Sequence, residues 1–343
     1  MMFIVRLGKN PVRAPILIQS AFRLFSTVGR ETIANGNAIP TSAEIVKETV
    51  VAATENIQDD SKRLQQIEEL KRKLKTLQDA QSGNRSKILD AYLCSNHFRF
   101  EEDKEKQSLT KLKQAMELIF LRDKPLVAID VEAYERSLGK VTEIGVVVYD
   151  PEVSEGSVLP VIKPFHIIIK ENLRLVNGRY VPDKKDRYMG GTSYVMPKDE
   201  AEKFVSAIIS KYVNDRDGVL VGHHIEGDIK WIRSIGVEIR SDVKIVDTFR
   251  LHGISRSRGG TLRGVLREVN LPHGNLHNAA NDAYFTLMAA LAYCDPHHRL
   301  DKNLDMFLQV EAKSATAKKL DLFSDRATFK NNLSADDLMK VLK

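Results

Sequence analysis

The stretch LVAIDVE, from Leu126 to Glu132, decides how the rest of the chain can fold. Its first residues are apolar on both faces, which is typical of a buried central strand. Asp130 and Glu132 are two residues apart, so a strand places both carboxylates on one face. Two such carboxylates repel each other unless a cation lies between them, and divalent metal ions prefer oxygen ligands. A strand that merely ends in solvent would show the same pattern, so the metal interpretation depends on further residues downstream.

Length and composition indicate a globular chain with one large domain or two. The 343 residues are 43% hydrophobic and 29% charged. The two cysteines, Cys94 and Cys294, are far apart, which indicates neither a disulfide framework nor a thiolate metal site. No apolar run approaches the roughly 20 residues that cross a bilayer. We therefore expect no membrane span.

The basic character of the chain is concentrated at its start. The formal net charge is +6, but residues 1–30 hold five basic residues and no acid, which leaves about +1 for the remainder. Arginine, serine and apolar residues without acids are typical of a mitochondrial transit peptide, whereas Pro11 and Pro15 interrupt the apolar core that a secretory signal needs. Residues 1–30 thus predict import into the mitochondrial matrix. A disordered basic tail is the alternative.

A helical extension is expected before the central strand. Residues 31–60 are polar and lack periodicity, which indicates a linker. Within 61–79, spacings of three and four separate the apolar residues, a pattern of coiled-coil type. This helix allows self-association, but it equally allows packing on the domain. Further helices are expected at about 86–99 and 108–121, which completes an extension over 61–121.

The domain itself is expected to span residues 122–295. Apolar and β-branched runs predict five strands, at about 125–133, 142–149, 165–170, 219–223 and 244–248. A loop is expected around 137–140 and a polar excursion at 172–191. Helical patterns occur at about 198–212, 227–234, 261–269 and 278–293. Short connections and then alternating helices and strands predict a mixed five-stranded α/β sheet with helices on both faces. Residues 296–343 are expected to be a charged tail, partly helical or disordered.

Three downstream residues can join Asp130 and Glu132. Asp228 follows a buried strand at the start of a helix, where a carboxylate is either a cap or a ligand. His277 lies in a polar loop, and Asp282 follows one turn into the next helix. Ala279 and its small neighbours let this helix lie close to the sheet. Asp282 can then face the strand carboxylates while His277 lies over the same place.

In this order and spacing, the five residues resemble the DEDDh 3′→5′ exonuclease family, which has an RNase H-like fold. The matching positions are Asp130, Glu132, Asp228, His277 and Asp282. The resemblance covers roughly residues 122–295. Within the family, the chain is most similar to a fungal branch named after "good for full DEAD-box helicase activity", which shares the segment 177–183. Relatives usually carry Asn where His224 stands and Phe where Gly227 stands, and the first difference puts in doubt how Asp228 is held.

The resemblance implies a nuclease that hydrolyses DNA or RNA from the 3′ end. Two divalent ions suit this chemistry, because together they activate the attacking oxygen and stabilise the leaving one. Asp130, Glu132, Asp228 and Asp282 are the expected ligands, and Glu132 also counts as catalytic. Mg²⁺ is the expected ion, and Mn²⁺ may substitute. His277 is the expected general base. The alternative is a nucleic-acid-binding or adaptor protein that keeps the fold without the chemistry.

Two clusters of basic residues are candidates for nucleic-acid contacts. Loop arginines beside glycines suit phosphate binding, and cations mixed with tyrosines suit single strands. An ordinary solvated surface is the alternative for both clusters. The expected contact residues are Arg250, Arg256, Arg258 and Arg263 near Gly259, and Lys184, Lys185, Arg187 and Tyr188 in the polar excursion.

Overall fold

The computed structural model describes residues 42–79, 85–155 and 160–310 of the chain, with side chains from Asp59 onwards. The chain divides at Ser61 into two units. The described part of the first unit is helical and belongs to α2 (Ser42–Asp79). The expected transit peptide, residues 1–30, lies outside the described residues. The second unit begins at Lys62 and contains the sheet.

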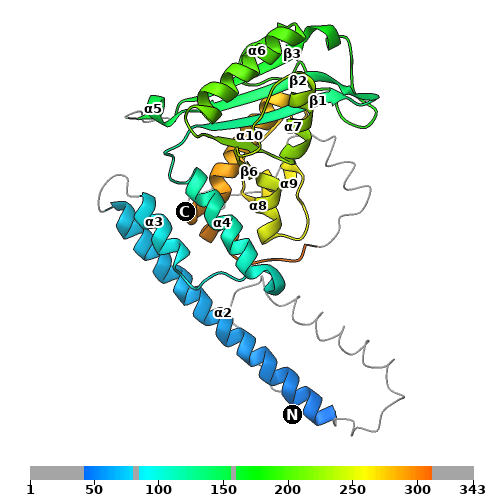
Figure 1. The fold of residues 1–343 in the computed structure, drawn as a ribbon. Helices are drawn as coiled ribbons and strands as arrows, with labels where there is room; N and C mark the ends of the chain where they lie inside the picture. Colours follow the sequence, from blue (N-terminus) through cyan, green and yellow to red (C-terminus); the bar gives the residue numbers. More distant parts are fainter. Residues whose placement is uncertain (1–41, 80–84, 156–159, 311–343) are drawn as a thin grey trace, which may run out of the picture. The chain divides into compact units, whose positions relative to one another are not determined.

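A six-stranded sheet forms the centre of this unit, in the order β4-β3-β2-β1-β5-β6 (Figure 1). Strands β1, β2 and β3 form an antiparallel meander, whereas β5 and β6 continue parallel to β1, and β4 is parallel to β3. The expected mixed RNase H-like α/β architecture is confirmed, with one strand more than predicted. The strands are β1 (Leu126–Tyr134), β2 (Ser137–Tyr149), β3 (Ile162–Ile169), β4 (Ser193–Met196), β5 (Val219–Gly222) and β6 (Lys244–Asp247).

The alternation of side chains along β1 divides the interior into two apolar layers. Val127, Ile129 and Val131 face one layer, which is completed by the helices after β4 and β5. Leu126 and Ala128 face the other layer, with the helices after β6. Asp130 and Glu132 continue the second face. The helices are α6 (Lys198–Ile208), the π-helix η3 (Ile209–Asn214) and α7 (Ile225–Ser234) on the first face, and α8 (Thr248–Ser255), α9 (Leu262–Glu268) and α10 (Ala279–Tyr293) on the second (Figure 1).

The helical extension belongs to the second apolar layer. Ile67, Leu70 and Leu74 from α2 are buried in the same cluster as Leu126. These apolar residues of α2 therefore pack on the domain of the same chain, which was one of the two possibilities for the 61–79 pattern. The linker prediction for 31–60 is wrong for its described part, because residues 42–60 continue α2. The other helices here are α3 (Arg85–Leu93), η1 (Glu102–Lys104) and α4 (Glu105–Ile119).

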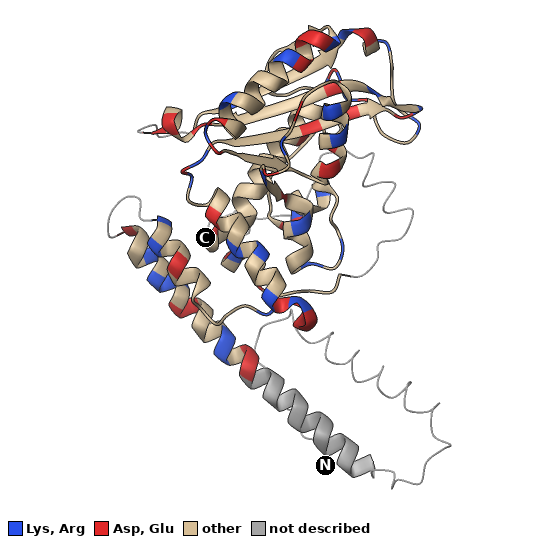
Figure 2. Cartoon of the chain, viewed as in Figure 1, with Lys and Arg blue, Asp and Glu red and all other residues tan. Residues whose placement is uncertain are grey.

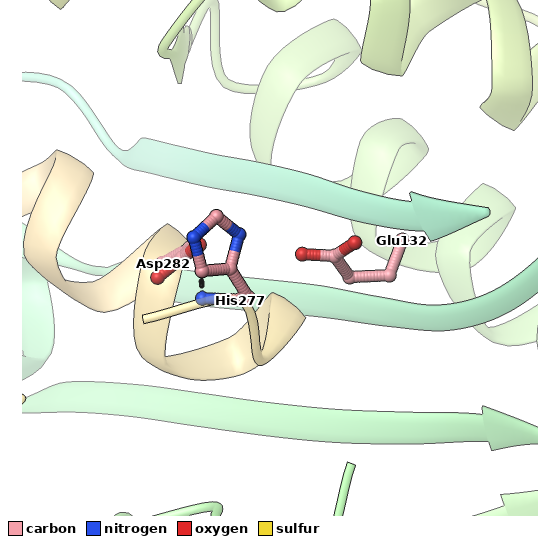
Figure 3. Close-up of side chains that lie close together, drawn as sticks. All are labelled: Glu132, His277 and Asp282. Carbon is pink, nitrogen blue, oxygen red and sulfur yellow. Dashed lines mark hydrogen bonds between the residues drawn. The ribbon is translucent and has the colours of Figure 1, made fainter. Parts of the chain in front are cut away.

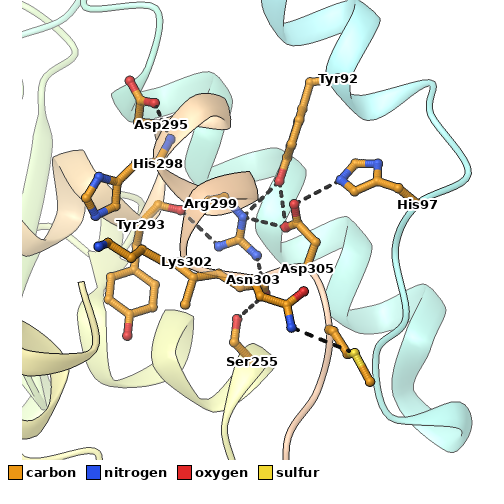
Figure 4. Close-up of polar contacts among 12 residues, drawn as sticks. Tyr92, His97, Ser255, Tyr293, Asp295, His298, Arg299, Lys302, Asn303 and Asp305 are labelled. Carbon is orange, nitrogen blue, oxygen red and sulfur yellow. Dashed lines mark hydrogen bonds and ion pairs between the residues drawn. The ribbon is translucent and has the colours of Figure 1, made fainter. Parts of the chain in front are cut away.

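Residues 296–310 are packed into the domain, which corrects the expectation of a peripheral tail. Helix α11 (Pro296–Asp301) carries Arg299, which is fully buried and contacts Asp305 at 2.8 Å. Asp305 also accepts a hydrogen bond from Tyr92 of α3, at 2.6 Å (Figure 4). This network joins the extension to the chain after α10. The remainder of the expected tail, residues 311–343, lies outside the described residues.

Smaller differences concern connections. The expected loop at 137–140 is strand, because β2 begins at Ser137 and pairs with β1 directly after a tight turn. Short elements that the sequence did not predict are α5 (Pro151–Ser154) and η2 (Lys170–Asn172). Along the described part of the chain, no helix has both the length and the apolar character needed to span a membrane.

Candidate active site

The carboxylates of β1 lie where the strand leaves the apolar core. Asp130 and Glu132 are partly exposed, whereas the residues that alternate with them are buried. Across the ladder, Glu132 is paired with Glu143 of β2, and Asp130 with Gly145. The sequence therefore predicted correctly that both carboxylates share one face. It did not predict that the buried Glu143 adds a further acidic group beside them.

Helix α10 brings Asp282 and His277 to this face. Asn278 caps the helix and accepts a hydrogen bond from the backbone N–H of Asn281. Gly145 is required for the close approach, because a Cβ atom there would lie 2.0 Å from the carbonyl oxygen of Ala279. The backbone N–H of His277 donates to the Asp282 carboxylate at 2.9 Å. The loop residue and the helix residue are thus fixed to each other.

Asp228 serves the site and does not cap its helix. Helix α7 begins at Ile225, so Asp228 lies inside the first turn, where it is 5% exposed. Its carboxylate accepts a hydrogen bond from the backbone N–H of Val131 at 3.1 Å. This bond joins α7 to β1 between the two strand carboxylates. It does not involve the side chain of His224, so the difference from relatives at that position leaves this bond to Asp228 in place.

All five predicted residues line one cavity of about 590 Å³. Ligand atoms of Glu132, His277 and Asp282 lie within 4.8 Å of one another, so the imidazole lies directly beside two of the carboxylates. Figure 3 shows Glu132 reaching toward the His277 imidazole from β1, with Asp282 beside it from α10. Asp130 and Asp228 complete the same wall. The structure therefore brings together the set that the sequence predicted.

Burial and mutual repulsion raise the pKa values of these carboxyl groups. Burial raises the pKa of Asp130 to about 7, with a further contribution from Glu143. Burial, followed by repulsion from Asp130, raises the pKa of Asp228 to about 9. The same two causes, in the same order, raise the pKa values of Glu132 and Asp282 well above the ordinary range. Four ionised carboxylates at this place are unfavourable unless cations accompany them.

The donor set fits divalent metal ions. Oxygen ligands from carboxylates are those that Mg²⁺ and Mn²⁺ prefer. Oxygen Oδ1 of Asp282 is buried and has no hydrogen-bond partner within the described chain, although buried carboxylate oxygens normally have one. A cation beside this oxygen would supply the missing interaction. The residues present therefore suit the ions that the resemblance implied.

The predicted arginine cluster does not form one exposed surface, because its members differ in burial. Arg256 is 4% exposed, and it binds the Glu268 carboxylate at 2.8 Å and the carbonyl oxygens of Ser255 and Met306. Its prediction as a nucleic-acid contact is wrong, because this guanidinium is used to hold the C-terminal segment. Arg263 is 8% exposed and lies near enough to Asp282 to oppose the rise in the pKa of that carboxyl. Arg250 is exposed and pairs with Glu226, and Arg258 is exposed on the loop.

The cations of the polar excursion are also divided by burial. Lys185 is 9% exposed, and its ammonium donates to the carbonyl oxygen of Leu175 at 2.7 Å, so it stabilises the loop and is not available to phosphates. Lys184 and Tyr188 are half-buried, and Arg187 is exposed. The last three remain candidates for nucleic-acid contacts.

Aromatic residues of the cavity were not predicted as site residues. The ring of His224 stacks on Phe249, with ring centroids 3.6 Å apart and planes inclined by 30°. His223, whose pKa burial lowers to about 4, and Trp231 line the same cavity. His223 and His224 directly follow β5, at the end of the sheet where β1 carries its acids. That position was the signal that these histidines belong to the site.

The domain is similar to several known proteins. Residues 125–293 match the family model described as "DNA polymerase III subunit epsilon-like, C-terminal domain". "Good for full DBP5 activity protein 2" of Saccharomyces cerevisiae is 32% identical over 252 residues, which cover 65% of this chain and 43% of the relative. "Uncharacterized protein YDR514C" of the same yeast is 36% identical over 215 residues, which cover 55% of this chain and 44% of the relative. The chain thus spans less than half the length of these two relatives.

Solved structures with similarity to the chain include Escherichia coli exonuclease I in complex with a dT13 oligonucleotide. That similarity covers 53% of this chain and 43% of the other, with 14% sequence identity and a TM-score of 0.35. A likeness of this size says nothing about the activity of this chain.

Proposed function

We propose that the chain, whose residues 125–293 match a DEDDh exonuclease-like family model, is a metal-dependent 3′→5′ exonuclease acting on DNA or RNA. One observation carries the proposal. The four carboxylates and the histidine of the family pattern line a single cavity, and ligand atoms of Glu132, His277 and Asp282 lie within 4.8 Å of one another. A fold kept only for binding would not need all five side chains to converge.

The carboxylates of Asp130, Glu132, Asp228 and Asp282 would hold two Mg²⁺ ions, for which Mn²⁺ can substitute. Such ions, when bound, activate the attacking water and stabilise the leaving 3′ oxygen. The chain supplies the geometry. Asp228 is held against β1 by the Val131 N–H, and Asp282 is held by the N–H of His277, so two ligands are fixed by backbone donors before any substrate arrives.

His277 is placed to move the proton. Its imidazole lines the cavity beside Glu132 and Asp282, and its backbone is tied to the Asp282 carboxylate (Figure 3). A neutral imidazole accepts the proton that the attacking water loses, which is general-base catalysis. A carboxylate oxygen of Glu132 lies within 4.8 Å of the His277 imidazole, which is close enough for both side chains to bind one water.

The substrate of the proposal is a nucleic acid, and its contacts must be local. Basic and acidic residues are interspersed along the described chain (Figure 2). Where cations alternate with acids in this way, phosphate contacts come from individual well-placed cations. Arg250, Arg258, Lys184 and Arg187 remain the candidates for this role.

The decisive experiment uses purified full-length protein with single-stranded DNA and RNA oligonucleotides labelled at the 5′ end. With Mg²⁺, we expect a ladder of products shortened from the 3′ end, and no products in excess chelator. Asp282→Asn should abolish the ladder. If the wild type binds both oligonucleotides but shortens neither with Mg²⁺ or Mn²⁺, the chain is the non-catalytic binding protein of the alternative.

For location we propose the mitochondrial matrix, on the basis of the acid-free, arginine-containing residues 1–30. A fluorescent reporter fused behind residues 1–40 should be imported and shortened. A reporter that stays in the cytosol at its full length contradicts this part of the proposal.

A further inference from the structure

Residues 173–192, which we call the strap, connect η2 to β4 without regular secondary structure. A connection of this length without helix or strand is uncommon in a compact domain and is often functional. Its backbone is nevertheless fixed at two places by side-chain hydrogen bonds. Both places belong to the elements that carry the candidate metal ligands.

The first anchor joins the strap to the end of β1. The side chain of Asn177 accepts a hydrogen bond from the backbone N–H of Glu135 at 2.9 Å and donates to the carbonyl oxygen of Ala133 at 3.0 Å. In return, the Glu135 carboxylate accepts from the backbone N–H of Tyr180 at 2.8 Å. This anchor begins one residue after Glu132.

The second anchor joins the strap to the start of α10. Asn281 is 3% exposed and directly precedes Asp282. Its amide donates to the carbonyl oxygen of Arg187 at 2.9 Å, and its oxygen accepts from the N–H of Met189 at 3.0 Å. Asn278, the cap of α10, donates to the carbonyl oxygen of Lys184 at 3.1 Å. Residues 277–282, which include His277 and Asp282, therefore also hold the strap through Asn278 and Asn281.

Between and beside these anchors the strap presents cations and aromatic rings. Tyr180 is 58% exposed, and the Arg179 guanidinium lies over its ring at 5.1 Å from the centroid. The side chain of Arg187 is 61% exposed. Cations bind phosphates, and aromatic rings stack on unpaired bases. Such a surface suits single strands, because the base faces of a duplex are not exposed.

We propose that the strap binds the unpaired strand just upstream of the scissile phosphate, and that Asn281 is the positioning residue that fixes this surface relative to the metal ligands. This inference rests on the proposed exonuclease activity and deepens it. Asn177 joins the strap to β1, and Asn281 joins it to α10, so two elements that carry metal ligands hold the same binding surface. A strand that lies on the strap is thereby delivered to the carboxylates with its 3′ end in the cavity.

The test compares substrates of two lengths. A single-stranded 20-mer reaches the strap, whereas thymidine 5′-monophosphate p-nitrophenyl ester fills only the cavity. Asn281→Ala should raise the KM for the 20-mer about 5- to 30-fold, the effect of losing hydrogen bonds worth one or two kcal/mol. Hydrolysis of the ester should stay within about twofold, since uniform loss of upstream binding leaves the chemical step intact. Asn303→Ala, which removes a comparable hydrogen bond to Arg63 far from the strap, is the matched control and should change neither.

The outcomes separate the two proposals. Equal losses on both substrates would overturn the strap inference, because the defect would then lie in the cavity. If the wild type hydrolyses neither substrate, the exonuclease proposal fails. The strap is then tested by fluorescence anisotropy with a labelled single-stranded 20-mer, where Asn281→Ala should again bind about 5- to 30-fold more weakly than the wild type, and equal affinities would overturn it.

Two further measurements guard against misfolding of the variant. Trypsin should cut Asn281→Ala faster after Lys184 and Arg187 than it cuts the wild type or Asn303→Ala, since the released strap becomes accessible. If Asn281→Ala does not fold, the surface pair Tyr180→Ala and Arg187→Ala, which leaves the anchor intact, should show the same selective loss on the 20-mer. An unchanged 20-mer KM in that pair would contradict the proposal.

Discussion

At the scale of single residues, His277 is held in an unusual backbone conformation. Its φ is 71°, a left-handed value that non-glycine residues adopt infrequently and often at functional sites. The hydrogen bond from its N–H to Asp282 compensates for part of that strain. The conformation therefore fits a residue retained for its side chain.

His277→Ala should lower kcat by roughly 10²–10⁴-fold, the usual size of general-base catalysis, while metal and substrate binding persist. The wild-type rate should fall on the acidic side of the pH profile, because the imidazolium cannot accept a proton. The variant should lack that limb. The measurement is kcat against pH with the single-stranded 20-mer.

His273 provides the control for this prediction. Its imidazole contacts the carbonyl oxygen of Leu271 and packs against Phe285, away from the cavity lining. His273→Ala should keep the wild-type kcat and pH profile. The opposite result, with an inactive His273 variant and an active His277 variant, would refute the assignment of the base.

Asp228 links the site to stability. Its folded pKa of about 9 exceeds the ordinary value of 3.8, so between these pH values the folded protein binds more protons than the unfolded chain. The free energy of unfolding of the metal-free protein should therefore fall as pH rises through this window. Asp228→Asn keeps an oxygen for the Val131 N–H but carries no charge. We expect it to abolish hydrolysis and raise the melting temperature in chelator by several degrees at pH 8, and by much less at pH 4.

The pKa of Asp217 is shifted in the opposite direction to that of Asp228, so Asp217 serves as the control. This exposed carboxylate pairs with Lys124 and Lys244, and their hydrogen bonds lower its pKa to about 2. Asp217→Asn should leave the melting temperature at pH 8 equal or slightly lower. A melting temperature of Asp228→Asn below that of the wild type at pH 8 would show that the carboxylate contributes packing beyond its charge.

The sequence was sufficient for the five site residues because their chemistry depends on spacing along strands and helices. It was insufficient for Arg256 and Lys185, because burial decides what a cation contacts. Arg256 binds Glu268 and carbonyl oxygens of residues 302–306. No sequence pattern near Arg256 predicts these partners. Such contacts join segments that meet only after folding.

At the scale of elements, the network around Arg299 fastens α3 and α11 together. Burial favours the neutral form of Asp305, but the charge of Arg299 and the hydrogen bonds with His97 and Tyr92 together outweigh it, so the pKa of the carboxyl is lowered overall. Asp305→Ala would leave a fully buried guanidinium without its charge partner (Figure 4). Breaking a buried pair in this way costs about 3–5 kcal/mol. Denaturant unfolding should show that loss.

Asp301 is the matched control on α11. Its exposed carboxylate pairs with Lys71 at 3.2 Å, and surface pairs contribute at most about 1 kcal/mol. Asp301→Ala should therefore unfold within about 1 kcal/mol of the wild type. If the Asp305 variant is no less stable than the Asp301 variant, the network does not hold α3 and α11 together.

Elements with strong periodicity were predictable, and those that depend on neighbours were not. Helix α10 begins one residue after the predicted start, because Asn278 is a strong cap. Strand β4 was missed, since four half-exposed edge residues show no alternation of their own. Helix α8, which Asp247 caps directly after β6, was also missed, because Arg250 and Arg256 were grouped with the loop arginines near Gly259.

At the scale of the whole molecule, the helical extension and the six-stranded sheet share one apolar layer. Leu74, Leu112, Met116 and Ile119 are fully buried in the cluster that also contains Leu126 of β1. The sequence placed a domain boundary before residue 122, because motifs mark the site and not the limits of a core. The residues of the extension that pack against β1 are apolar and belong to no catalytic motif, so only the structure assigns them to the domain.

This shared layer predicts how fragments behave. Burying one large aliphatic side chain stabilises a fold by about 1.5–3 kcal/mol, so losing these four would remove about 6–12 kcal/mol. That is comparable with the whole stability of an ordinary domain, about 5–15 kcal/mol. A fragment of residues 62–310 should unfold cooperatively, close to the full chain. A fragment of residues 122–295 should lack a cooperative transition and bind a hydrophobic dye such as ANS. If residues 122–295 melt cooperatively within a few degrees of the longer fragment, the extension is an accessory to the domain that carries the site and not part of its core.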